Sequence, residues 1–308
     1  MRVLILHPNF PGQFRDPARH LAEAGHDVLF MCETKSRKSI PGVRLLKLKS
    51  TDPGHREKVN ALGPTKLARL RAGCYLDAFL QLHGNFYTPD LIISHSGWGC
   101  GWYVHHVWPD RPQISYSEWF FNQTDALALF NQEARWPVVS YKSKAHPSKQ
   151  KAKPDRNAMM LYELCHASAI VAPTYWQRMQ LPGHIRSRCQ VIYDGIDSAL
   201  FDPKPRSEAD DSASLLLTYG TRGMEPMRGF PDFVEELQLC LDEFTNLTVE
   251  IAGEDQTFYS ADRPPRPWPT WGSWARARLE PWLQQGRVRF IGSLPYVKYR
   301  QWLAASDV

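Results

Sequence analysis

Residues 1–25, MRVLILHPNFPGQFRDPARHLAEAG, read as one complete strand–turn–helix unit. The run Arg2–Leu6 is almost wholly apolar, as expected of a short strand that is covered on both faces. Phe14–Ala24 then has a helical pattern; it opens with Asp16-Pro17, a capping residue followed by proline in the first turn, and it stops before a glycine. A unit of this kind predicts an α/β fold with a parallel sheet.

The same alternation continues along the first two thirds of the chain. Further apolar strands are predicted at Asp27–Met31, Val43–Leu48, Asp90–Ser94, Pro112–Tyr116, Ser168–Ala172 and Gln190–Tyr193. Helical patterns lie between several of them, at Lys66–Leu82 and Arg156–Ala167. Strands separated by helices predict a doubly wound, Rossmann-like sheet.

A second α/β series follows a change in composition. Ser198–Ser212 is rich in proline, serine and acidic residues and is predicted to be a linker (198–212) between an N-terminal domain (1–197) and a C-terminal domain (213–308). The second series is predicted to contain strands at Ser214–Tyr219, Thr248–Ala252 and Arg287–Ile291, and helices at Phe230–Phe244, Trp274–Gln285 and Tyr296–Ala305. A Rossmann-like unit usually has about five or six strands. We therefore expect the C-terminal domain to be incomplete, or to be completed by a partner.

Composition limits the kind of protein and its partners. Hydrophobic residues make up 43% of the 308 residues and charged residues 22%, which favours a packed globular protein over a disordered one. The net charge of +5 favours anionic partners such as nucleotides, but it is too small to indicate a nucleic-acid binder. The six cysteines have neither CxxC nor metal-ligand spacing, so we expect reduced thiols and no metal site.

The sequence predicts a cytoplasmic protein. The apolar run at the N-terminus is too short for a signal peptide, and no stretch is long enough for a transmembrane helix. One basic segment, Arg135–Arg156, is rich in Lys, Pro and Ser and is predicted to be a loop. It is either a solvated loop or a docking surface for an anionic acceptor or for lipid headgroups at the inner face of the membrane.

The strongest local motif is Tyr219–Phe230, YGTRGMEPMRGF, between a predicted strand and a predicted helix. Gly220 allows a ligand to approach the backbone closely, and the helix that begins near Phe230 directs its free N–H groups and positive dipole end at the loop. Arg222 and Arg228 are able to hold a diphosphate through bidentate hydrogen bonds. The alternative is a pair of surface arginines on an ordinary loop.

Other candidate residues follow the ends of predicted strands, where doubly wound sheets bind their ligands. Gly12 either lets the backbone approach a ligand or serves a tight turn, and Phe10 lies in the same turn. His95 is a candidate ligand contact or a structural histidine. The remaining candidates are Trp98 as a ring wall, Glu118 as a hydroxyl ligand or an arginine partner, and Gly253 and Glu254 after a later strand.

Several motifs in combination resemble one enzyme family, the retaining "group 1" or family-four glycosyltransferases of the GT-B fold. The resemblance covers nearly the whole chain. It rests on Val171–Gln177 (VAPTYWQ), Val191–Asp197 (VIYDGID), Thr221–Phe230 (TRGMEPMRGF), Phe290–Tyr296 (FIGSLPY) and Ser306–Val308 (SDV). Arg222 and Arg228 match the basic pair that holds the donor diphosphate, with Arg at the second position in place of the commoner Lys and a spacing one residue longer than the usual pattern.

The resemblance implies transfer of a hexosyl group from a UDP- or GDP-sugar to a saccharide or lipid-linked acceptor, with retention, without metal or cofactor, and in bacterial surface polysaccharide synthesis. It implies catalytic roles for Arg222, Arg228 and His95, and places Gly292, Ser293 and Leu294 near the nucleobase. It also implies donor contacts at Gly12, Gly220, Gly253 and Glu254, a contact of His95 with the transferred sugar, and acceptor contacts at Phe10, His95, Trp98 and Glu118. Two glutamates that the family uses beyond the SDV motif do not occur in this chain, which again predicts an incomplete donor domain. A sugar-nucleotide epimerase of the same fold and a non-catalytic remnant that binds a glycan or a partner protein are the alternatives.

Overall fold

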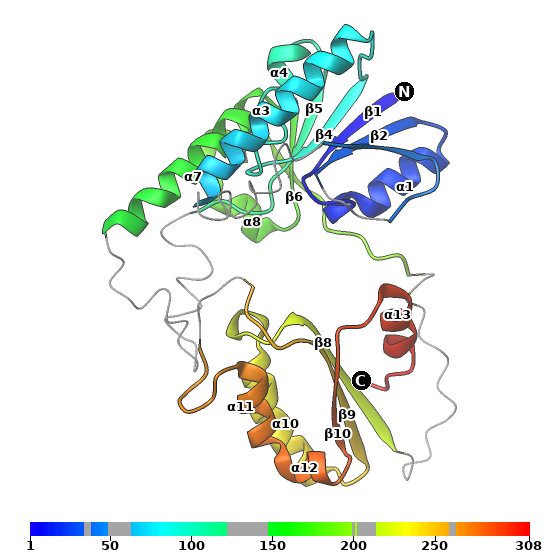
Figure 1. Cartoon of the computed structure of the whole chain (residues 1–308), viewed down its shortest axis with the longest axis vertical. Helices are drawn as coiled ribbons and strands as arrows, with labels where there is room; N and C mark the ends of the chain where they lie inside the picture. Colours follow the sequence, from blue (N-terminus) through cyan, green and yellow to red (C-terminus); the bar gives the residue numbers. More distant parts are fainter. Residues whose placement is uncertain (34–37, 49–62, 122–146, 199–200, 202–213, 259–262) are drawn as a thin grey trace. The chain divides into compact units, whose positions relative to one another are not determined.

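The computed structural model describes residues 1–33, 38–48, 63–121, 147–198, 201, 214–258 and 263–308. The chain forms two compact units, of which one holds Met1–Asp125 with Pro147–Gly195 and the other holds Ile196–Val308. Each unit is built on its own parallel sheet (Figure 1). Most of the predicted linker 198–212 lies outside the described residues, so the exact domain boundaries stay a prediction.

The first unit contains a seven-stranded sheet in the order β3-β2-β1-β4-β5-β6-β7, and every neighbouring pair is parallel. Its strands are β1 (Arg2–Leu6), β2 (Asp27–Cys32), β3 (Val43–Lys47), β4 (Leu91–His95), β5 (Gln113–Tyr116), β6 (Ala169–Ala172) and β7 (Cys189–Val191). Chain order reverses direction beside β1, because β2 and β3 lie on one side of it and β4 lies on the other. This confirms the predicted doubly wound α/β fold.

Helices cover both faces of this sheet (Figure 1). On one face, Ala18 of α1 (Arg15–Glu23) and Phe14, the residue before this helix, pack against the side chains of Val3, Ile5 and Phe30. On the other face, α3 (Gly63–Gly84) packs through Tyr75 and Phe79 against the alternate residues of β1. The strands are buried on both faces, which explains their continuous apolar runs. The remaining elements are η1 (Gly12–Phe14), α4 (Val104–Val107), α7 (Pro147–His166), α8 (Tyr175–Gln180) and α9 (Gly183–Arg186).

The second unit contains a three-stranded parallel sheet in the order β10-β9-β8. Its core joins the apolar face of α10 to Trp271 and Trp274 of α11, while α13 lies across the sheet from these helices (Figure 1). The elements are β8 (Leu215–Gly223), η2 (Pro226–Arg228), α10 (Phe230–Glu243), β9 (Leu247–Glu254), α11 (Trp271–Arg278), α12 (Glu280–Gln284), β10 (Val288–Gly292) and α13 (Tyr296–Ala304).

Three predicted boundaries were wrong. β8 continues to Gly223, through the start of the predicted phosphate loop, because Gly220 pairs with Ala252 and Gly223 pairs with Glu254 across an irregular register. The predicted helix Trp274–Gln285 is two helices, since Pro281 has no N–H group and its ring disfavours a helix that continues through it. Helix α7 begins at Pro147, inside the segment predicted as the loop Arg135–Arg156, and proline is well suited to the first position of a helix.

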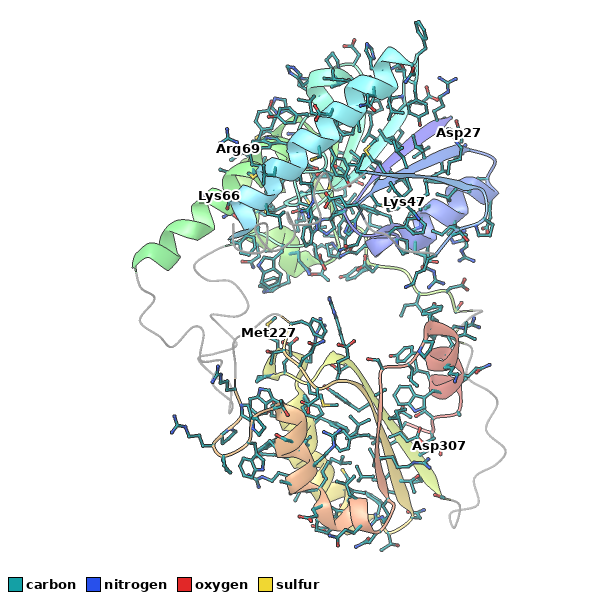
Figure 2. The ribbon with its side chains drawn as sticks, in the orientation of Figure 1. Asp27, Lys47, Lys66, Arg69, Met227 and Asp307 are labelled. Carbon is teal, nitrogen blue, oxygen red and sulfur yellow. The ribbon has the colours of Figure 1, made fainter. Side chains whose placement is uncertain are left out.

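The last described residues lie beside β8. Asp307 N donates to Leu216 O at 2.9 Å, and Leu216 N donates to Oδ2 of Asp307 at 2.8 Å (Figure 2). The SDV motif, Ser306–Val308, therefore pairs with the backbone of β8, although it does not form a regular strand. Among the residues that the structure describes, no helix combines the length and the apolar character needed to span a bilayer.

Candidate functional site

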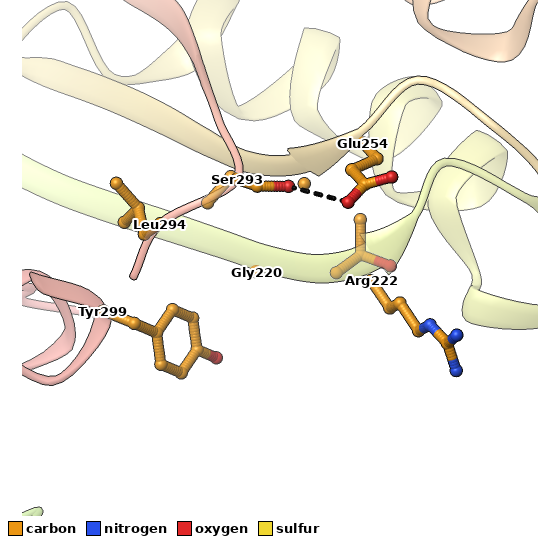
Figure 3. Close-up of a pocket in the computed structure, with 9 residues that line it drawn as sticks. Gly220, Arg222, Glu254, Ser293, Leu294 and Tyr299 are labelled. Atoms are coloured by element: carbon orange, nitrogen blue, oxygen red, sulfur yellow. Dashed lines mark hydrogen bonds between the residues drawn. The ribbon is translucent and has the colours of Figure 1, made fainter. Parts of the chain in front are cut away.

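A pocket of about 280 Å³ opens at the carboxyl ends of the three strands of the second unit. We call it the strand-end pocket; it is lined by Gly220, Thr221, Arg222, Ala252, Gly253, Glu254, Ser293, Leu294 and Tyr299. Figure 3 shows these side chains, which come from β8, β9, the residues after β10, and α13. Parallel α/β sheets bind their ligands at this end. Six of the nine predicted donor-site residues are thus brought together here, namely Gly220, Arg222, Gly253, Glu254, Ser293 and Leu294.

Two glycines of this pocket are closely packed. Gly253 has φ +146°, and a Cβ there would lie 2.4 Å from the backbone O of Thr221. A Cβ at Gly220 would lie 2.9 Å from the hydroxyl of Tyr299, so a side chain of α13 occupies the space that we predicted for the approach of a ligand. Gly292, with φ +70°, lies outside the lining of the pocket.

The two predicted phosphate-binding arginines differ in their surroundings. Arg222 lines the pocket, and its Cζ lies 4.2 Å from the centroid of the Phe258 ring. Figure 3 shows its guanidinium on the opposite side of the pocket from Leu294 and Tyr299. Arg228 ends η2 and does not line the pocket; its Nε lies 3.8 Å from Oε1 of Glu225, which is fully buried.

The polar wall of the pocket is the carboxylate of Glu254. The hydroxyl of Ser293 donates to its Oε1 at 3.3 Å, and the side-chain amide of Gln256 donates to its Oε2. The Glu254 side chain is exposed at the end of β9, so it is accessible to a ligand. A carboxylate and a guanidinium, Glu254 and Arg222, therefore face the same space, which provides acceptors for ligand hydroxyls and donors for ligand phosphates.

The first unit brings a second group of predicted residues together at the carboxyl ends of β1, β4 and β5. We call it the His95 cluster; it consists of His7, Gln13, Phe14, His95, Trp98, Tyr116 and Glu118. Nε2 of His95 lies 3.1 Å from Oε2 of Glu118, and its Nδ1 lies 2.8 Å from the backbone O of Ser96. Both ring nitrogens face acceptors, and an imidazole donates from both only when it is doubly protonated.

Glu118 is held from two sides. The Gln13 amide donates to its Oε2 at 3.0 Å, in addition to the contact from His95. The hydrogen bond from His95 is the main factor that lowers the pKa of Glu118 below its usual range. Glu118 thus pairs with a histidine within the cluster, rather than with the arginine that the sequence allowed as an alternative.

Aromatic rings surround His95. The ring of His7 lies 5.3 Å from that of His95, and the ring of Tyr116 lies 5.2 Å from it, both edge to face. Burial, and then the neighbouring charge of His95, lower the pKa of His7 to about 4. Trp98 lies 6.1 Å from both imidazoles and is 37% exposed, so its ring forms an accessible wall of the cluster.

Gly12 and Phe10 are closely packed against other residues of the first unit. A Cβ at Gly12 would lie 2.6 Å from two ring atoms of His7, and its φ is +54°, so the turn needs glycine there to accommodate this imidazole. Phe10 is 6% exposed and packs edge to face on Phe30 at 4.9 Å, within the core beneath α1. Its ring offers little surface to an acceptor in this arrangement.

A buried carboxyl lies behind the His95 cluster. Glu163 of α7 accepts hydrogen bonds at Oε1 from Ser94 (2.6 Å), Ser115 (3.0 Å) and Gln113 (3.4 Å). These donors belong to β4 and β5, the strands that lead to His95 and Glu118. Burial raises the pKa of Glu163 to about 7. The carboxyl therefore joins two strand ends from the side of α7.

Comparison with protein families identifies the family of this chain. The model described as "Glycosyl transferase family 4 group" matches residues 24–201, which is more than half of the chain. This chain belongs to the glycosyl transferase family 4 group. The match includes β4, β5 and all of their His95-cluster side chains, whereas the strand-end pocket of the second unit lies beyond it.

Solved structures agree with a GT-B fold for this family 4 chain. The catalytic domain of starch synthase IV from Arabidopsis thaliana, bound to ADP and acarbose, is 14% identical; the alignment covers all of this chain and 77% of that one, with a TM-score of 0.57. WaaG, a glycosyltransferase involved in lipopolysaccharide biosynthesis, is 15% identical over all of this chain and 74% of its own, with a TM-score of 0.53. At such identities the likeness shows the fold alone.

The epimerase alternative is also represented among these structures. A putative UDP-N-acetylglucosamine 2-epimerase from Listeria monocytogenes is 10% identical over 99% of this chain and 72% of its own, with a TM-score of 0.51. The fold therefore does not separate the two activities, and it is the family match that favours the transferase. No curated protein sequence matches the family 4 chain.

Several residues of these sites were not singled out from the sequence of this family 4 member, among them His7, Gln13, Tyr299 and Glu163. His7 and Gln13 lie within the turn that carries Gly12, but nothing in the turn indicates that both side chains reach the end of β4 and β5. Tyr299 reaches the strand-end pocket from α13, and Glu163 reaches β4 and β5 from α7. Only the packing of distant segments brings these residues to the sites.

Proposed function

We propose that this chain transfers a hexosyl group from a UDP- or GDP-sugar to a saccharide or lipid-linked acceptor, with retention of the anomeric configuration. The observation that carries this proposal is the strand-end pocket, where residues from all three strand ends of the second sheet gather around Arg222 and Glu254. The donor would bind as a substrate, and no further cofactor is proposed. The role in surface polysaccharide synthesis, on the cytoplasmic side of the membrane, belongs to the same proposal.

The donor would bind with its diphosphate at Arg222 and with its ribosyl and sugar hydroxyls toward Glu254 and Ser293. As the bond from the anomeric carbon to the diphosphate breaks, negative charge grows on the leaving oxygens, and a fixed guanidinium stabilises this charge more than it stabilises the bound substrate. Each charge-assisted hydrogen bond contributes about 1.5–3 kcal/mol. Arg228 and the N-terminus of α10 would contribute in the same sense.

The His95 cluster would receive the groups that react. The two ring nitrogens of His95 face the carboxylate of Glu118 and the backbone O of Ser96, so both neighbours hold the imidazole in one orientation. We assign His95 to a contact with the transferred sugar, Glu118 to the position of an acceptor hydroxyl, and Trp98 to an accessible ring wall for the acceptor. The membrane contact through Arg135–Arg156 stays a proposal, because residues 135–146 lie outside the described part of the chain.

A donor panel tests the proposed function. The chain is incubated with UDP-glucose, UDP-galactose, UDP-N-acetylglucosamine and GDP-mannose, and proton NMR follows the anomeric signals and the release of UDP or GDP. Slow release of a sugar whose first-formed anomer matches the donor supports a retaining transferase. Conversion of UDP-N-acetylglucosamine to its 2-epimer would favour the epimerase, and no turnover of any donor together with retained glycan binding would favour the remnant.

A further inference from the structure

We propose that Glu225 and Phe258 are positioning residues, which hold the two arginines of the motif Thr221–Phe230 in place for a diphosphate before the ligand arrives. This inference rests on the proposed function. Neither residue lines the strand-end pocket, and the sequence motif gives no role to either of them. They would act through Arg222 and Arg228, because Phe258 contacts Arg222 and Glu225 contacts Arg228.

Glu225 joins two segments that are distant in the sequence. Its Oε2 accepts a hydrogen bond from the backbone N–H of Phe258 at 3.0 Å, and its Oε1 lies 3.8 Å from Nε of Arg228. The carboxyl is fully buried. A buried carboxylate is stable only while it keeps its partners. The hydrogen bond therefore holds the 258 backbone, and the charge of the carboxylate attracts the Arg228 side chain at ion-pair distance.

Phe258 carries the second contact. Its ring lies under the guanidinium of Arg222, 4.2 Å from Cζ. The ring reaches this place because residue 223 is glycine: a Cβ there would lie 2.6 Å from Cδ2 of Phe258 and 2.6 Å from the backbone O of Gln256. A guanidinium stacked on a ring keeps its N–H groups in the plane parallel to the ring, where their edges are available to phosphate oxygens.

The two contacts form one unit. Glu225 fixes the backbone of Phe258, the Phe258 ring fixes Arg222, and the same carboxyl fixes Arg228. Arginines ordered in advance lose less conformational freedom when a ligand binds, and this raises affinity without any new contact to the ligand. The effect concerns the diphosphate alone, because nucleoside groups would contact other parts of the strand-end pocket.

The test compares a nucleoside diphosphate with its nucleoside. Calorimetric titrations use UDP, GDP, ADP and the three corresponding nucleosides, with wild type, Phe258→Leu, Phe258→Tyr and Glu225→Gln. We expect Phe258→Leu and Glu225→Gln to weaken binding of the diphosphate with the highest affinity about tenfold, as the loss of a cation–π contact or an ion pair predicts. The nucleoside affinity should stay within a factor of two, and Phe258→Tyr should restore the diphosphate affinity.

The chain offers matched controls. Phe290 lies under Arg276 at 4.3 Å outside the lining of the pocket, and Asp27 pairs with Arg44 at 2.7 Å in the first unit. Phe290→Leu and Asp27→Asn remove the same kinds of contact and should leave both affinities unchanged. A readout without ligand comes from NMR, since the ring current of Phe258 should shift the Hε of Arg222 upfield, and Phe258→Leu should abolish this shift.

The outcomes separate this inference from the proposed function. Diphosphate affinities of Phe258→Leu and Glu225→Gln equal to wild type, with Arg222→Ala still weakened, would overturn the inference alone. An equal loss of diphosphate and nucleoside affinity would also overturn it, because a general structural role predicts that result. If Arg222→Ala binds as wild type does, or if wild type binds no diphosphate, the proposed function and the inference fail together.

Discussion

Nε2 of His95 lies 3.1 Å from Oε2 of Glu118, and this contact joins the ends of two neighbouring strands, β4 and β5. His95 is almost wholly buried, while 45% of the Glu118 side chain is exposed. The pair therefore presents the Glu118 carboxylate to solvent and keeps the His95 imidazole behind it. This arrangement suits a site where neutral hydroxyl groups bind beside a charge that is balanced internally.

Removal of the His95 imidazole should slow sugar transfer without loss of donor affinity. For His95→Gln we expect the rate with the donor identified in the panel to fall about tenfold or more, the effect of one lost charge-assisted hydrogen bond. Diphosphate affinity should not change, because that ligand binds the second unit. Gln13→Ala, which removes only the outer hydrogen bond to Glu118, is the milder control. A wild-type rate for His95→Gln would remove His95 from the reaction.

Glu163 should make stability depend on pH. Its pKa is raised in the folded state to about 7 from 4.5, so its contribution is fully present below pH 4.5 and is lost as the pH rises through 7. Each unit of pKa difference corresponds to about 1.4 kcal/mol. Glu163→Gln does not titrate, and its unfolding free energy relative to wild type should therefore rise between pH 5 and pH 8. Urea denaturation at several pH values measures this, and a constant difference would contradict it.

Substitution at Gly12 should destabilise the first unit more than substitution at Gly25. Both residues have positive φ, +54° and +80°, but only at Gly12 would a Cβ meet other atoms, those of the His7 ring. We expect Gly25→Ala to cost about 1 kcal/mol for its backbone conformation alone, and Gly12→Ala to cost roughly 1–3 kcal/mol more. Equal midpoints of denaturation for the two variants would show that the turn adapts without strain.

The strands and the fold class could be predicted because each strand is short, apolar and covered on both faces. Where a boundary predicted from the sequence was wrong, a contact between distant segments explains the difference in one case. β8 extends through Gly220 and Gly223 because β9 pairs with it there, although the glycines indicate a loop. In the other case, Pro281 indicates a helix break, although the prediction gave one continuous helix across it.

The sequence predicted that the candidate residues follow strand ends, but it did not predict which side chains contact one another. His95 and Glu118 each follow a predicted strand, but only the sheet order, with β4 beside β5, brings them together. Tyr299 and Phe258 carry no local signal, since their positions depend on glycines at 220 and 223 that accommodate them. Gly220, which we predicted to allow the approach of a ligand, instead lies against the side chain of Tyr299.

The most direct measurement of the central claim is the affinity of nucleoside diphosphates for wild type and Arg222→Ala. Titration calorimetry with UDP, GDP and ADP should show tightest binding of one diphosphate to wild type, and Arg222→Ala should weaken it about tenfold or more. Arg278→Ala, which removes an exposed arginine of α11 that stacks over Trp274, should bind as wild type does. Equal affinities for wild type and Arg222→Ala would contradict the assignment of the strand-end pocket to a sugar-nucleotide diphosphate.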